Sequence, residues 1–350
     1  MAEYISFQPK DYYSTVLYTG TGATRTVTGV GFQPDFTWIK QRDGTYYQQL
    51  YDSARGAGYH LASNDTAAQS ALDTAGLSAW TADGFTVNTR AQVNYNTGTF
   101  TSWNWKGGTT SGITTDGSTT ITPSAYSFSA TSGISIVQYS GNNTSGAKVA
   151  HGLGAAPGMI IVKTINTANS WNIYQQAVDA TAPEDYYMTF GTDARTDDSS
   201  RWNDTAPDSV NFTLGNAAAV NGSSNTMIAY CFANKTGYSK IGSYVGNGVA
   251  DGTFVYTGFR PAFLMIKRYD GVASWYVYDD KRLGYNVDNN ANRPDADWAT
   301  DTTDVLDLVS NGFKLRNSGS SWNGSLDDYV YAAFAEFPIV SSNDVPGVAR

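Results

Sequence analysis

Aspartates recur at an equivalent place in three similar stretches of the chain. Of all the side chains, they come closest to a catalytic pattern. Each follows a short apolar stretch: Asp52, Asp179, and Asp279 with Asp280. Two carboxylates at a suitable separation can act as the acid and the base of glycoside hydrolysis. An aspartate after a strand also caps turns by accepting hydrogen bonds from backbone N–H groups. Because the position recurs, the sequence favours turn capping over catalysis or metal binding.

Histidine and cysteine offer little further chemistry. His60 and His151 lie far apart without metal-ligand spacing. His151 stands where related stretches carry threonine, which favours a structural role. Cys231 lies in an apolar run and is predicted to be a buried, inert thiol.

An acidic loop from Asp193 to Asp204 would suit calcium best among the metal ions, since calcium prefers carboxylate and carbonyl oxygens. The loop lacks the Asp-x-Asp-x-Asp-Gly spacing of a calcium-binding loop, and the chain has no Gly-x-Ser-x-Gly motif. We therefore predict a protein that is not an enzyme and has no catalytic residue, metal ion or cofactor.

Aromatic side chains in loop-like segments are the remaining candidates for binding. Flat rings with amide or carboxylate neighbours hold sugars and partner surfaces in many proteins. Trp202 is flanked by Arg201 and Asn203, and Trp322 is followed by Asn323. These five residues are the predicted ligand-binding positions. The alternative is that both tryptophans fill small cores.

The element around which the chain is organised is a glycine turn, a proline and an apolar run that ends in lysine. Its three copies run from Gly29 to Lys40, from Gly152 to Lys163 and from Gly258 to Lys267. Glycine and proline belong just before a strand, because glycine adopts turn angles and proline cannot donate to a sheet. The apolar run is continuous, which predicts a strand covered on both faces. We expect the lysine to mark where the strand regains solvent.

Other landmarks keep the same order around each copy. A Tyr-x-Gly triplet precedes the element, and it begins at Tyr18, Tyr139 and Tyr244. An aromatic strand closes each copy, and it begins at Phe100, Met227 and Tyr329. Self-similarity of this kind predicts repeated structural units.

Composition indicates β structure, with 24 Tyr, 15 Phe, 9 Trp and 35 Gly, and with short strands bounded by turn residues. We predict an all-β fold of three consecutive related β-sandwich-like modules. The predicted segments are an N-terminal arm (1–14), module 1 (15–106), a Gly/Ser/Thr-rich linker (107–133), module 2 (134–235), module 3 (238–338) and a C-terminal tail (339–350).

The net charge of -9 argues against a nucleic-acid partner, because binding to backbone phosphates needs an excess of Lys and Arg. No apolar run is long enough for a membrane span. The start, Met1 to Ser6, lacks the basic and apolar regions of a signal peptide. We therefore expect neither nucleic acid nor a membrane as a partner.

One stretch of the N-terminal arm, three stretches of module 1 and the C-terminal end share a resemblance. They run from Tyr4 to Pro9, Gly31 to Lys40, Asp83 to Val87, Gly98 to Lys106 and Asn343 to Arg350. Together they resemble a module repeated in structural proteins of tailed bacteriophages, especially aquatic phages. Modules 2 and 3 are less similar and lack the tryptophan pair at the end of module 1. The resemblance implies a virion protein that is assembled in the host cytoplasm and carries no catalytic motif.

Two roles stay open under that resemblance. One is a capsid decoration or accessory protein on the particle exterior, with major capsid or tail proteins as partners. The other is a tail-fibre or receptor-binding adhesin that recognises host surface glycans. We favour decoration because no fibrous shaft segment is present. Virion parts are typically homo-oligomers, although the three modules could instead mimic a trimer within one chain.

Overall fold

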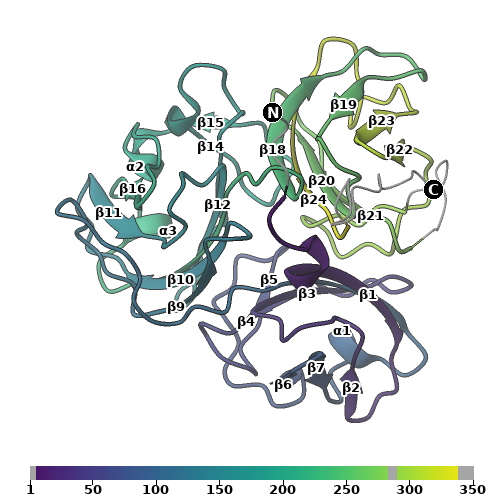
Figure 1. Cartoon of the computed structure of the whole chain (residues 1–350), viewed down its shortest axis with the longest axis horizontal. Coiled ribbons are helices and arrows are strands. Elements are labelled where there is room, and N and C mark those ends of the chain that lie inside the picture. Colours follow the sequence, from purple (N-terminus) through teal and green to yellow (C-terminus); the bar gives the residue numbers. More distant parts are fainter. Residues whose placement is uncertain (1–4, 283–289, 338–350) are drawn as a thin grey trace.

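Three stretches of the chain each form a four-stranded antiparallel sheet, and the three sheets have the same strand order (Figure 1). The computed structural model describes residues 5–282 and 290–337. The strands are, in spatial order, β1 (Tyr13–Thr19), β8 (Thr99–Trp105), β3 (Phe36–Gln41) and β4 (Gln49–Asp52) in module 1; β10 (Ile134–Ser140), β17 (Thr226–Phe232), β12 (Met159–Thr164) and β13 (Asn172–Gln175) in module 2; and β18 (Ser239–Val245), β24 (Asp328–Phe334), β20 (Phe263–Arg268) and β21 (Trp275–Asp279) in module 3. The strand order and direction are therefore the same in the three modules.

A smaller sheet covers the outer face of each large one. The outer strands are β2 (Arg25–Val27), β7 (Gly84–Val87) and β6 (Leu77–Thr81) in module 1; β11 (Ala147–Ala150) and β16 (Asn211–Leu214) in module 2; and β19 (Phe254–Tyr256), β23 (Gly312–Leu315) and β22 (Leu306–Val309) in module 3. A separate hydrophobic core lies between the two sheets of each module. The predicted all-β fold of three sandwich-like modules is confirmed.

Short elements complete the modules. They are β5 (Leu61–Ala62), which extends the large sheet of module 1; β9 (Ala125–Ser129), which extends that of module 2; the pair β14 (Tyr186–Tyr187) and β15 (Thr196–Asp197); the helices α1 (Ala91–Asn94), α2 (Ser199–Trp202) and α3 (Ala218–Asn221); and the 3-10 turns η1 (Pro9–Asp11) and η2 (Pro183–Asp185).

Two predicted segment boundaries differ from the structure. The segment 107–133 is more than a linker, because β9 pairs with β10 and Thr109 forms a bridge with Phe128. The segment 1–14 contains the start of β1, and Phe7 packs edge-on against Tyr238 of module 3, with 5.3 Å between ring centroids. The chain start therefore fastens module 1 to module 3. The predicted tail, 339–350, lies outside the described residues.

The three large sheets turn their inner faces toward one shared core, and the modules form three lobes around it (Figure 1). Trp105, Phe232 and Phe334 occupy the same register position at the ends of β8, β17 and β24. Their rings touch one another, with centroids 5.4, 5.6 and 6.1 Å apart. This triangle lies where the modules converge, so the chain has an internal pseudo-threefold axis. The three modules thus mimic a trimer within one chain.

The repeated lysines hold the three modules together, and the expectation that they regain solvent is wrong. Lys40, Lys163 and Lys267 are all fully buried. Each Nζ atom donates to a backbone carbonyl of another module: Lys40 to Asp297 (3.1 Å), Lys163 to Thr66 (2.9 Å) and Lys267 to Thr192 (3.0 Å). These bonds run from module 1 to 3, from 2 to 1 and from 3 to 2, and so close a ring.

Further carbonyls complete each lysine site. Nζ of Lys40 also donates to the carbonyls of Gly44 and Tyr46, and Nζ of Lys163 to those of Thr164 and Asn169. Burial lowers the pKa of each lysine from 10.5 to about 8. Carbonyl oxygens therefore replace water around a cation at each boundary between modules.

A second hydrogen bond repeats at the same boundaries. The donors are Gln48, Trp171 and Trp275. Each directly precedes the residue that pairs, across the sheet, with the residue before its own module's lysine. Their side-chain N–H groups donate to the carbonyls of Arg293 (2.5 Å), Ala62 (3.0 Å) and Thr189 (2.7 Å), in the same direction around the ring. Two equivalent positions per module therefore bind the neighbouring module through its backbone.

We predict that Lys163→Met lowers the free energy of unfolding by about 2–3 kcal/mol, because three backbone carbonyls lose a charged donor. Urea denaturation measures the change. Lys240→Met is the control, since Lys240 is exposed on β18 and its loss is expected to change stability by less than about 0.5 kcal/mol. Equal effects of the two substitutions would contradict a structural role for the buried ammonium group.

Candidate functional site

The five predicted ligand-binding residues do not come together. Trp202 ends α2 in module 2 and is only 2% exposed, so it fills the core of its module, as the alternative interpretation of the sequence holds. It packs edge-on against Tyr174, with 6.1 Å between centroids. Trp322 belongs to module 3, where it is half-buried and its ring contacts Tyr276 at 4.8 Å. Each tryptophan packs on the core of its own module.

The neighbours of Trp202 serve local structure. The Arg201 guanidinium lies over the Tyr187 ring at 4.6 Å and within 3.5 Å of the Asp198 carboxylate. Asn203 ends α2 in the left-handed conformation, with φ of 54°, a role that asparagine fills more readily than most residues. No described contact links either side chain to the Trp322 region.

Asn323 is one of three equivalent buried asparagines, which also include Asn94 and Asn221. Each lies five residues before the last strand of its module. Each side-chain oxygen accepts the backbone N–H of the residue after the Tyr-x-Gly triplet. The bonds are Thr21 to Asn94 (2.8 Å), Asn142 to Asn221 (2.9 Å) and Asn247 to Asn323 (3.0 Å). Asn323 therefore has an architectural role, which its constant spacing in the sequence would have revealed.

The Tyr-x-Gly landmark has a matching explanation. The hydroxyls of Tyr18, Tyr139 and Tyr244 donate to the carbonyl of the residue before each buried asparagine, at 2.7–2.8 Å. The glycine permits close approach, since a Cβ on Gly20 would lie 2.1 Å from the carbonyl oxygen of Tyr95. One repeated clamp thus ties the end of the first strand to the start of the last.

The recurring aspartates cap turns, as predicted. The Oδ1 atoms of Asp52, Asp179 and Asp279 accept backbone N–H groups two or three residues later, at 2.8–3.1 Å. The Oδ2 atom of Asp52 also accepts the hydroxyl of Tyr230 at 2.7 Å, and that of Asp279 accepts the indole N–H of Trp103 at 3.0 Å. These two carboxylates therefore stabilise contacts between modules as well. Asp280 is buried, which raises its pKa to about 6.

His151 and Cys231 are both fully buried. The Nε2 atom of His151 lies 3.1 Å from the carbonyl oxygen of Asp208, and its Nδ1 atom accepts the N–H of Leu153. Burial raises the pKa of the Cys231 thiol. Among residues 5–282 and 290–337, no group of three or more His, Cys, Asp or Glu side chains is arranged to hold a metal ion.

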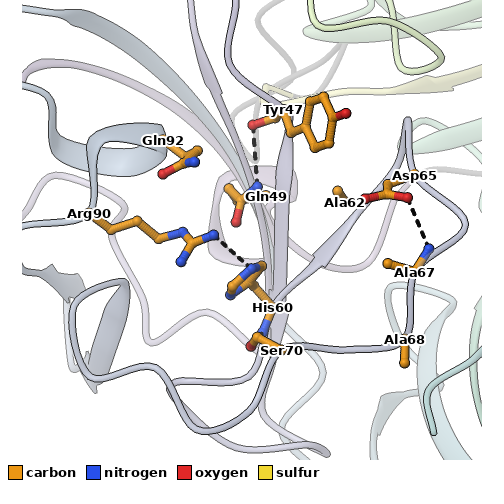
Figure 2. Close-up of a pocket in the computed structure, with 10 residues that line it drawn as sticks. All are labelled: Tyr47, Gln49, His60, Ala62, Asp65, Ala67, Ala68, Ser70, Arg90 and Gln92. Carbon is orange, nitrogen blue, oxygen red and sulfur yellow. Dashed lines mark hydrogen bonds between the residues drawn. The ribbon is translucent and has the colours of Figure 1, made fainter. Parts of the chain in front are cut away.

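A pocket of about 160 Å³ in module 1 is the strongest candidate site, and the sequence analysis missed it (Figure 2). Its polar lining comes from three segments of module 1, and the stretch between Ala62 and Ser70 adds small side chains. The main lining residues are Tyr47, Gln49, His60, Asp65, Arg90 and Gln92. Gln49 lies at the centre of the group, with Arg90 and Gln92 on one side and Asp65 on the other (Figure 2).

Arg90 and Asp73 form an ion pair beside the pocket, and His60 is hydrogen-bonded to Arg90. Arg90 binds the Asp73 carboxylate at 2.7 Å and the Nε2 atom of His60 at 3.0 Å. Burial, followed by the nearby guanidinium charge, lowers the pKa of His60 from 6.5 to about 4. His60 is therefore neutral at pH 7, and Arg90 occupies its Nε2 lone pair. The pocket thus presents hydrogen-bonding groups rather than a histidine poised as a base.

Gln49 has a buried side-chain oxygen without a hydrogen-bond partner beside the pocket. Its side chain is 2% exposed, and its Nε2 atom donates to the carbonyl of Tyr47 at 3.4 Å. Among the described residues, none donates a hydrogen bond to its Oε1 atom. The Oε1 atom is itself closed off from solvent, so it is a buried polar atom behind the pocket wall rather than a group that a ligand reaches.

A family model described as "Domain of unknown function (DUF7483)" matches residues 8–338. The chain belongs to this family. The match covers all three modules, so the unit that the family describes is the closed ring rather than one module. No curated protein and no solved structure matches the chain. In the part of the chain that the structure describes, no helix has the length and apolar character needed to cross a membrane.

The depressed pKa of His60 predicts a pH dependence of stability. Between pH 6.5 and about 4 the unfolded chain gains a proton at this residue and the folded chain does not. The contribution to stability is therefore complete above pH 6.5 and is lost as the pH falls through about 4. Within this window the free energy of unfolding falls as the pH is lowered. We expect the fall to be smaller for His60→Gln than for the wild type, by about 1.4 kcal/mol per pH unit. Parallel slopes in urea titrations of both proteins would show that His60 titrates normally.

Proposed function

We propose that the chain is a non-enzymatic structural protein on the exterior of a tailed-phage virion, most simply a capsid decoration or accessory protein. It would be assembled in the host cytoplasm and bind major capsid or tail proteins. The resemblance of module 1 to phage structural modules motivates the proposal. The family to which the chain belongs carries no described activity.

The observation that carries this proposal is the closed ring of three equivalent modules. A protein lattice has threefold positions, and a binder there must offer three similar contacts. A homotrimer offers these contacts with three chains. This chain instead carries three similar modules, which the buried lysines and the central aromatic triangle hold together. The ring geometry therefore suits one chain at a threefold position. Association into a homo-oligomer stays a prediction.

The pocket favours a second candidate, a tail-fibre or receptor-binding adhesin that recognises host surface glycans. Decoration by itself requires no small-molecule pocket. The opening beside Tyr47, a residue that is 45% exposed, offers an aromatic side chain next to amide and carboxylate groups. That combination is suited to a sugar.

Cryo-electron microscopy of purified particles, with copy number measured by quantitative mass spectrometry, tests the proposal. We expect one chain at each threefold position of the head lattice, where density processed without symmetry shows three related but unequal lobes. A few copies at the tail would instead favour the adhesin. Absence of the chain from purified particles would refute the virion assignment.

A further inference from the structure

Comparison of the three modules shows how the residues of the pocket differ from their counterparts in modules 2 and 3. Gln49 corresponds to Asn172 and Tyr276, because each pairs with the residue before its module's repeated lysine. Arg90 lies four residues before its buried asparagine, and Ala217 and Gly319 hold the same place in modules 2 and 3. Arg90 is thus replaced by a small residue in modules 2 and 3, whereas the amide of Gln49 is kept in module 2 by Asn172, whose Oδ1 atom also lacks a partner.

His60 differs among the modules as well. It directly precedes Leu61, the partner of Leu50, and the corresponding residues are Tyr187 and Ala291. In module 3 the place of Gln49 is taken by Tyr276, whose ring contacts Trp322 at 4.8 Å and lies under the Arg293 guanidinium at 5.2 Å. Aromatic packing therefore occupies in module 3 the region where module 1 has a polar pocket.

Both boundaries of module 1 hold the walls of this pocket in place. Asp65 and Ala67 flank Thr66, whose carbonyl accepts the Lys163 ammonium of module 2 at 2.9 Å. Tyr47 lies between Tyr46, whose carbonyl accepts Lys40 at 2.8 Å, and Gln48, which binds module 3. The lining is therefore positioned before any ligand arrives, which lowers the entropy lost on binding.

The charges of the pocket identify the class of ligand. Asp73 neutralises Arg90 through a 2.7 Å contact, and Asp65 adds a carboxylate whose Oδ1 atom accepts the N–H of Ala67. The local balance is therefore not positive, which disfavours an anion. The Gln92 amide, the Asp65 carboxylate and the Ser70 hydroxyl of the lining instead match a ligand with several hydroxyls.

We propose that the module 1 pocket binds one neutral monosaccharide unit of a glycan. Gln92 and Asp65 bind neighbouring hydroxyls of the sugar, and the Tyr47 ring packs on an apolar face of the sugar at the rim. The inference deepens the second candidate function and rests on it, whereas a decoration protein does not require this site.

Saturation-transfer difference NMR on the full chain tests the site with the methyl glycosides of glucose, galactose, mannose and N-acetylglucosamine as probes. We expect millimolar binding of at least one of them. Tyr47→Ala and Gln92→Ala are expected to weaken that binding by roughly tenfold or more, which corresponds to about 1.4 kcal/mol. Tyr256→Ala is the matched control, because Tyr256 is an exposed tyrosine on β19 of module 3, and it is expected to leave binding unchanged.

Methyl glucuronide, an anionic probe of similar size, separates a neutral-sugar site from an anion site. Binding of the glucuronide without any neutral glycoside would overturn the proposal, as would equal binding by the wild type and both pocket variants. Circular dichroism and a thermal unfolding curve for each variant show whether it is folded, and Gln92→Ala is expected to fold because Gln92 is half-buried and lies outside the cores. Failure of all four neutral glycosides to bind would refute the sugar site without bearing on the virion location.

Discussion

Three buried ammonium groups, one at each boundary between modules, are the interaction on which the remaining structure depends. A cation removed from water is costly unless oxygen ligands replace its hydration. Here those ligands are backbone carbonyls, and each lysine takes at least one from a different module. A module separated from its neighbours would leave its lysine without that partner. The requirement to satisfy each lysine therefore favours the closed ring over three modules on a string.

The aromatic triangle at the axis provides the apolar part of the same constraint. Trp105, Phe232 and Phe334 are buried only because all three large sheets converge on them. The closed ring of modules also has a consequence for function. At the periphery of the molecule it fixes hairpins and loops of two modules against each other. The pocket of module 1 is built from such segments, and its Tyr47 and Asp65 neighbour the carbonyls that bind Lys40 and Lys163.

Much of the fold could be predicted from the sequence, because the order of glycine, proline, apolar run and lysine reports on local strand structure. The capping role of Asp52 was predictable for the same reason. The burial of Lys40 was not, since its carbonyl partner Asp297 lies 257 residues away and no local pattern encodes it. Trp202 looked like a loop residue because α2 is a single turn. The pocket depends on differences between copies at His60 and Arg90, which emerge only after structural alignment of the modules.

Differential scanning calorimetry of the intact chain tests the closed ring most directly. If the lysine contacts and the shared core couple the three modules, the chain unfolds in one transition whose calorimetric and van't Hoff enthalpies are equal. Three resolved transitions, or a van't Hoff enthalpy near one third of the calorimetric value, would show that the modules unfold independently and would contradict the account.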